Sequence, residues 1–270
     1  MSTFRLNLAA AVAVLRRDIQ IFLSYRLRFI SQVVSTLFGV TLFYYVSRLV
    51  SVREFPSHDD YFAYVIVGIA TMELLTASLH TVPTTVRGEL VSGTFERMVV
   101  SPYGPVGGVV ALAWFPMLYA VVMVSVTLAL ASALFGLPLQ WSTVPLTVPV
   151  MLLGLLAFLP LALLLAAALL IVKQAASLAT FLISGLALAG GSFFPVSILP
   201  SGIRWISDVQ PLTPALELIR HELVGARIPE SAWLATAKLA AFAVVLLPIS
   251  ILAVSAAIRF CRARGTLIEY

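Results

Sequence analysis

Residues Val144–Val172 read VPLTVPVMLLGLLAFLPLALLLAAALLIV, a run without a single charged side chain. A helix crosses the hydrocarbon core of a bilayer with about 20 apolar residues, because each residue adds about 1.5 Å along the axis. A transmembrane barrel would instead show segments of about ten residues in which apolar and polar side chains alternate. The continuous run therefore predicts a transmembrane helix.

The composition of the whole chain indicates the same class. Of the 270 residues, 61% are hydrophobic and only 11% are charged, and the mean hydropathy is +1.05. A soluble globule of this length has too little interior to hide so many apolar side chains. We therefore expect an all-α integral membrane protein that forms a single transmembrane domain over residues 1–270.

The apolar runs predict six transmembrane helices. Their approximate bounds are residues 29–49, 61–80, 106–135, 144–172, 175–194 and 232–258. Only Lys173 and Gln174 separate the fourth run from the fifth. The two runs together are far longer than one crossing needs, so two spans with a tight turn at Lys173 fit best.

Residues 1–28 differ from the spans because arginines interrupt a rough apolar helical stripe. We expect a helix that lies in the membrane interface, where one face is apolar and the other is charged. A signal peptide is the alternative. Arg16, Arg17 and Asp18 break the apolar part and no clear cleavage site follows, so we expect the segment to be retained.

The proline-rich region before the last span contains apolar pieces that are too short to cross a membrane. Leucine and isoleucine nevertheless recur at helical spacing, at Leu212, Leu216, Ile219 and Leu223. We expect two short helices at the outer face, Ile198–Ser207 and Leu212–Val224, which dip into the bilayer as re-entrant helices. Glu217, Arg220 and His221 fall off the apolar stripe, and a solvent-exposed loop is the alternative.

The basic residues indicate how the chain is oriented. With six spans, eleven lysines and arginines fall on the side of the two termini and six fall on the other side or close to it. Because cytoplasmic segments carry the excess of positive charge, both termini are expected in the cytoplasm. These residues flank apolar runs rather than cover a polar domain, so they predict topology and not nucleic-acid binding.

Residues 87–103, RGELVSGTFERMVVSPY, form a polar island between the second and third runs. We expect a short cytoplasmic helix over residues 88–102, because Phe95, Met98 and Val99 fall on one helical face and Glu96 and Arg97 on another. Such a helix can receive a soluble partner. The alternative is an interfacial helix that only anchors a loop.

The island resembles the E-x-x-x-G-T-[LF]-E-x-[LM]-[LV]-x-S-P signature of the permeases of ATP-binding-cassette type 2 exporters. The matching residues are Glu89, Gly93, Thr94, Phe95, Glu96, Met98, Val99, Ser101 and Pro102. The stretch from Phe193 through Pro200 to Thr213 resembles the outer segment of the same family. By this resemblance, residues 88–102 are the coupling helix that contacts the ATPase.

The resemblance also implies partners and a direction of transport. Two ATP-binding-cassette ATPase subunits and a second permease copy, or a similar permease, would form the working complex in the inner membrane. Phe95, Met98 and Val99 would supply an apolar docking surface, and Glu89, Glu96 and Arg97 its polar rim. ATP and Mg²⁺ would be bound by the ATPase, with no cofactor in this chain. The cargo would be an amphipathic small molecule, a lipid or a lipid-linked glycan.

Motifs for independent chemistry are absent from the sequence. No G-x-x-x-x-G-K-[ST] loop occurs, so the chain is not expected to hydrolyse ATP by itself. His221 and Glu222 begin an H-E-x-x-H pattern that lacks its second histidine, and Cys261 is the only cysteine. We therefore expect no metal site, no internal disulfide and no enzyme in this chain alone.

Glu73 lies near the middle of the second predicted span. A charge at that depth costs a few kcal/mol unless it is paired, protonated or in contact with water. One interpretation is a contact with substrate or with a gating partner. The other is a structural hydrogen bond to another span, with Ser31, Gln32 or Lys238 as the expected partner.

Two other functions fit the composition. A motor-free channel or secondary transporter would be expected to show internal repeats and several intramembrane charges, whereas this sequence has no convincing repeat and one central acid. A scaffold that recruits a cytoplasmic enzyme through the polar island is the other alternative. A tightly bound ATPase would distinguish the exporter from both.

Overall fold

The computed structural model describes residues 3–50, 55–100, 104–172 and 175–264, and these residues form helices and no strand. In chain order the helices are α1 Thr3–Ser24, α2 Arg26–Leu49, α3 His58–Thr76, a π-helical turn Ala77–Thr81, α4 Val82–Val91, α5 Thr94–Val100, α6 Gly104–Phe135, α7 Val144–Val172, α8 Ala175–Gly190, a 3-10 turn Val196–Ile198, α9 Ser201–Asp208, α10 Leu212–Val224 and α11 Ala232–Arg264. The predicted all-α class is confirmed.

Within the described residues, five helical segments are long and apolar enough to cross a membrane. They are Arg26–Leu49, His58–Val91, Gly104–Phe135, Val144–Val172 and Ala232–Arg264. The fifth predicted span corresponds to α8, which has 16 residues and is shorter than the length one crossing needs. The count of six therefore stays a prediction. Lys173, at the expected turn, lies outside the described residues.

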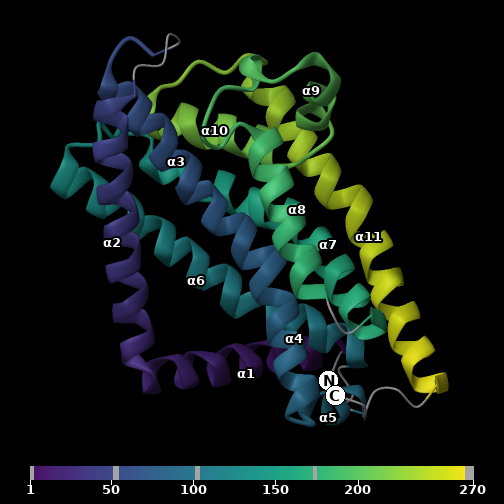
Figure 1. Ribbon diagram of the computed structural model, residues 1–270. Helices are drawn as coiled ribbons and strands as arrows, with labels where there is room; N and C mark the ends of the chain where they lie inside the picture. Colours follow the sequence, from purple (N-terminus) through teal and green to yellow (C-terminus); the bar gives the residue numbers. More distant parts are fainter. Residues whose placement is uncertain (1–2, 51–54, 101–103, 173–174, 265–270) are drawn as a thin grey trace.

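The long helices run side by side between two ends of the molecule (Figure 1). At one end α1 lies across the bundle, and α5 and the last turns of α11 lie at the same end. At the other end α9 and α10 cover the bundle. This arrangement separates a surface made by α1 and α5 from a surface made by α9 and α10.

Two apolar clusters hold the long helices together. One cluster, which includes the fully buried Ile66 and Phe158, joins α3, α6, α7 and α10. The second cluster, which includes Val86 and Leu163, joins α4, α6, α7 and α11. Because α7 contributes to both clusters, it connects the packing of one end to that of the other.

The helix expected over residues 1–28 ends earlier, at Ser24. Tyr25 has non-helical backbone angles, φ −110° and ψ 56°, and α2 begins directly after it. Phe22, in the last turn of α1, packs against Phe29, Phe115 and Tyr119, with ring centroids 5.3–5.9 Å apart. This aromatic contact fixes the junction of α1 and α2 against α6.

The two short helices expected at the outer face correspond to α9 and α10. The bounds of α10 agree with the sequence pattern, whereas α9 begins three residues later than expected, because Pro195 and Pro200 lead into a 3-10 turn and into α9 itself. Most of α10 is buried against α3, α7 and α11. It is therefore a packed part of the bundle and not a solvent-exposed loop.

Candidate functional site

The polar island forms a corner between two helices rather than one continuous helix. Residues 88–91 are the last turn of α4, and α5 covers Thr94–Val100. Gly93 lies between them with φ +71°, a backbone conformation that favours glycine because other residues carry a Cβ. The single helix predicted over residues 88–102 is corrected accordingly: Gly93 divides it, and α4 is continuous with the helical segment that begins at His58.

Glu89 braces this corner from the inside. Its carboxylate accepts a hydrogen bond from the Thr94 hydroxyl and forms an ion pair with Arg17 of α1, with 2.7 Å between the nitrogen and the oxygen. Arg17 also pairs with Asp18 at 2.8 Å. Only 12% of the Glu89 side chain is exposed. Glu89 therefore contributes little exposed surface to the described corner, and its place on the rim of a docking surface stays a prediction.

Asp18 gives this brace a half-buried acid next to its arginine. Burial raises the pKa of the Asp18 carboxyl, while the hydrogen bond and the charge of Arg17 act in the opposite direction. Arg17 therefore lies between two carboxylates, one from its own helix and one from α4. The three charges connect the interfacial region of the chain to the corner.

Phe95 also has a different position from the one the sequence suggests. Its side chain is 1% exposed and belongs to the second apolar cluster, together with residues of α4, α6 and α7. Met98 is half-buried and packs directly over Gly108 of α6. The predicted apolar docking surface is therefore corrected: Phe95 and Met98 attach α5 to the bundle.

The exposed surface of the corner between α4 and α5 is formed by a different set of residues. Val91, Ser92, Gly93 and Arg97 are exposed there. The side chains of Glu96 and Val99, and Ser101 and Pro102 as a whole, lie outside the described residues. The exposed patch that the structure describes is thus small and carries the Arg97 guanidinium.

Glu73 has a partner, but not one of the three expected. Glu73 Oε1 accepts a hydrogen bond from the Thr127 hydroxyl of α6 at 2.9 Å. Lys238 instead pairs with Glu230 at 2.6 Å, and the Ser31 hydroxyl donates to the backbone oxygen of Arg28. The sequence did not indicate Thr127 as the partner, because its side chain has a single polar atom and it lies 54 residues after Glu73.

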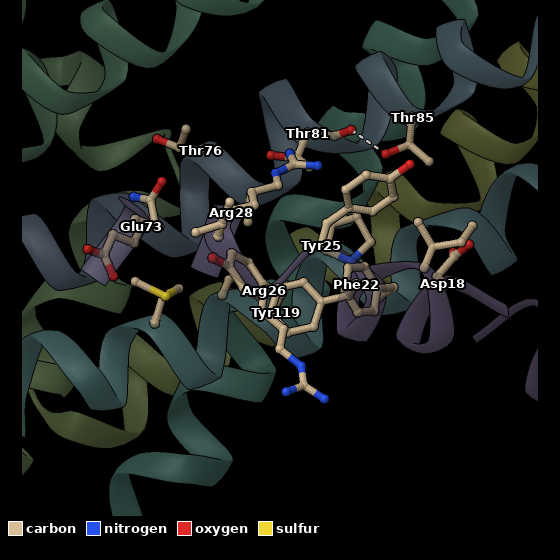
Figure 2. Close-up of a pocket in the computed structure, with 18 of the residues that line it drawn as sticks. Asp18, Phe22, Tyr25, Arg26, Arg28, Glu73, Thr76, Thr81, Thr85 and Tyr119 are labelled. Atoms are coloured by element: carbon tan, nitrogen blue, oxygen red, sulfur yellow. Dashed lines mark hydrogen bonds between the residues drawn. The ribbon is translucent and has the colours of Figure 1, made fainter. Parts of the chain in front are cut away.

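The Glu73 side chain lines a cavity of about 1000 Å³ (Figure 2). Glu73 Oε2 is buried and has no hydrogen-bond partner among the described residues. The carboxyl group and Gln32 both line the cavity, and so do residues of α1, α4 and α6. An unsatisfied buried oxygen is costly, so this atom marks a place where a ligand or water can bind.

Comparison with protein families gives one decisive result. The model of the ABC-2 type transporter family matches residues 9–223, from α1 through the corner to α10. The chain belongs to the ABC-2 type transporter family. No curated protein matches it. Because it belongs to this family, the chain is a multi-pass transmembrane permease subunit of an ABC transporter. Members of the family work with ATP-binding-cassette ATPases.

Among the described residues, Arg220 is a buried charge that the sequence pattern did not reveal. Arg220 of α10 is 5% exposed, and its guanidinium donates to the backbone oxygens of Tyr64, Gly191 and Ser192 at 3.0–3.2 Å. Its Cζ also lies 3.4 Å from the centre of the Tyr64 ring, within the range of a cation–π interaction. Arg220 thus joins α10 to α3 and to the segment after α8.

Burial lowers the pKa of Arg220 to about 10, while the interaction with Tyr64 opposes that change. The guanidinium is therefore charged at neutral pH, and the backbone oxygens compensate its charge. The helical spacing of the sequence puts Arg220 off the apolar stripe of its helix. A helical pattern cannot show that oxygens from two distant segments converge on the same position.

Proposed function

We propose that this permease is half of an exporter that moves an amphipathic molecule outward across the cell membrane. Two separate ATPase subunits would bind ATP and Mg²⁺ and contact the corner between α4 and α5 from the cytoplasm. A second copy of the chain, or a similar permease, would complete the transport path. Both termini would then lie in the cytoplasm, on the side with the excess of basic residues.

The observation that carries this proposal is the way α5 is attached. Phe95 is packed in the cluster that joins α4, α6 and α7, and Glu89 of α4 binds Thr94 of α5 and Arg17 of α1. Close-packed interiors deform little, so a force on α5 moves the helices attached to it. Because α4 continues the helical segment from His58, that movement reaches Glu73 and the cavity.

A flexible anchor would not need these contacts. A loop that only rests in the interface requires an apolar face toward lipid, whereas Phe95 faces the protein interior. The attachment therefore supports a force-bearing corner over a passive one. Transport by alternating access would follow if the two corners of a dimer were driven together and apart by the ATPase cycle.

The test is charge reversal at Arg97, the exposed basic residue of the corner. We expect Arg97→Glu to reduce co-purification of the ATPase subunit and ATP-driven transport in reconstituted vesicles at least tenfold, because a rim charge governs association. Arg227→Glu, an exposed arginine at the other end of the molecule, is the matched control and should leave both unchanged. Wild-type association and transport with Arg97→Glu would remove the docking proposal.

A further inference from the structure

The cavity beside Glu73 has the composition of a binding site for a small amphipathic molecule. It lies between the junction of α1 and α2, the segment from α3 to α4, and α6, and its volume is about 1000 Å³. Ligand pockets commonly measure about 300–1000 Å³. Figure 2 shows Glu73 toward one side of the view and Asp18 toward the other, with aromatic side chains between them.

The Glu73 end requires a polar partner. Glu73 Oε1 is occupied by Thr127, whereas Oε2 is buried without a partner among the described residues. A ligand hydroxyl fits this atom in either protonation state of the carboxyl group, because a hydroxyl both donates and accepts hydrogen bonds. A hydroxyl group on a ligand would therefore be favoured near Glu73.

The middle of the cavity is apolar and aromatic. Phe22, Phe115 and Tyr119 contact one another with ring centroids 5.3–6.2 Å apart and form one wall. Ile69 and Met72 of α3 also line the cavity. Aromatic rings bury a large apolar area with little loss of conformational freedom, so this wall suits a rigid apolar ligand body.

The end formed by the start of α2 carries uncompensated positive charge. Arg26 and Arg28 line the cavity, are exposed, and form no ion pair with any residue that the structure describes. Asp18, the nearest acid of α1 that lines the cavity, is already paired with Arg17. Arg28, Tyr119 and Glu73 line the same cavity (Figure 2), so one ligand in it would contact both charged groups.

We propose that this cavity binds an amphipathic acid: its anionic group pairs with Arg28, its apolar body packs on the aromatic wall, and a hydroxyl group binds Glu73. The proposal deepens the export function and rests on it only in naming this ligand class as cargo. Since the cavity borders α3 and α4, it would change shape when the α4–α5 corner moves.

The probe is cholate, a rigid steroid acid with a carboxylate at one end and hydroxyl groups on its rings. Its matched control is 5β-cholanic acid, which has the same skeleton and carboxylate without the hydroxyls. Binding is measured on the full permease in lipid nanodiscs without ATPase, and the signal of empty nanodiscs is subtracted. We expect cholate to bind about tenfold more tightly, because a hydrogen bond to a buried carboxyl group is worth that factor.

Variants of the permease test which residue binds the carboxylate of the ligand and which binds its hydroxyl group. Arg28→Gln should weaken both acids by a similar factor of about ten, because both carry the carboxylate. Glu73→Met should weaken only cholate and remove the difference between the two acids. Glu73→Gln keeps an oxygen that accepts a hydrogen bond from Thr127, so the fold should be preserved. This variant should retain part of the difference in affinity between cholate and 5β-cholanic acid. Arg259→Gln, an exposed arginine of α11 outside the cavity, should change neither affinity.

Two results would overturn the assignment. The first is equal affinity of the wild-type permease for the two acids, which requires no variant. The second is unchanged binding of both acids in Arg28→Gln. The export proposal is tested separately by ATPase association: a cholate-selective cavity without an associated ATPase refutes the exporter alone, and an associated ATPase with a non-selective cavity refutes this site alone.

Discussion

At the scale of single residues, Arg220 is a buried charge whose side chain is held by several contacts. Removing a charged group from water costs several kcal/mol unless its hydrogen bonds are replaced. Three backbone oxygens and the Tyr64 ring replace them here. This arrangement requires that α3 approach the segment after α8 very closely, and Gly68 makes that approach possible. A Cβ on Gly68 would lie 2.0 Å from the Ser192 oxygen and 2.9 Å from Arg220 Nη2.

Gly68→Ala is therefore predicted to destabilise the permease by about 2–4 kcal/mol, since the added methyl group would displace the oxygens that compensate Arg220. The measurement is the free energy of unfolding in mixed micelles. Gly39→Ala is the matched control, because a Cβ at Gly39 of α2 would meet no atom within 4 Å and alanine favours a helix. Equal stability of the two variants would show that the Arg220 contacts contribute little.

At the scale of elements, the corner between α4 and α5 depends on an ion pair from a third helix. The pair between Arg17 and Glu89 is partly buried, with side chains 41% and 12% exposed. The pair between Arg48 and Asp59 has the same nitrogen–oxygen distance, 2.7 Å, but its side chains are 41% and 60% exposed. Water screens an exposed pair more strongly, so the two pairs should differ in strength.

A double-mutant cycle with Arg17→Gln and Glu89→Gln is predicted to give a coupling free energy of about 1 kcal/mol. The cycle with Arg48→Gln and Asp59→Asn serves as the control. It should give a smaller coupling free energy, near the lower end of the range for surface ion pairs. Both are measured from unfolding in mixed micelles. If the Arg17 cycle gave no coupling, α1 would not brace the corner.

The sequence could predict the elements far better than their contacts. Continuous apolar runs determine where helices form, and the leucine spacing located α10 to the residue. The same reasoning put Phe95 on a docking surface, because periodicity shows which residues share a face but not which protein surface covers that face. The partner of Glu73 was missed for a related reason: Thr127 comes from another helix, and only the packing of α3 on α6 brings them together.

At the scale of the whole molecule, burial is distributed unevenly over the long helices. α7 contributes to both apolar clusters and is mostly buried, whereas most of α2 and of α11 is not buried and exposes apolar side chains such as Phe38 and Val245. In a membrane protein such faces meet lipid or another transmembrane subunit. This distribution fits the proposal that a second permease pairs with the chain, since one bundle of this size encloses only part of a path.

The orientation of the molecule is the prediction on which the proposed coupling depends. Cys261 is the only cysteine, is 1% exposed and donates to the Leu170 oxygen at 3.2 Å, so Cys261→Ala gives a background for labelling. In that background we expect a membrane-impermeant maleimide to modify Arg227→Cys in intact cells. Arg97→Cys should react only after the membrane is permeabilised, because the corner would face the cytoplasm.

Val245→Cys, on an exposed apolar face of α11, is the control for the bilayer interior. Its thiol should stay unmodified in both conditions, because a thiol reacts as the thiolate and an apolar environment disfavours ionisation. Modification of Arg97→Cys in intact cells would place α5 outside, where no ATP-driven subunit could reach it. The exporter would then lose its site of coupling, while the cavity beside Glu73 could still bind its amphipathic acid.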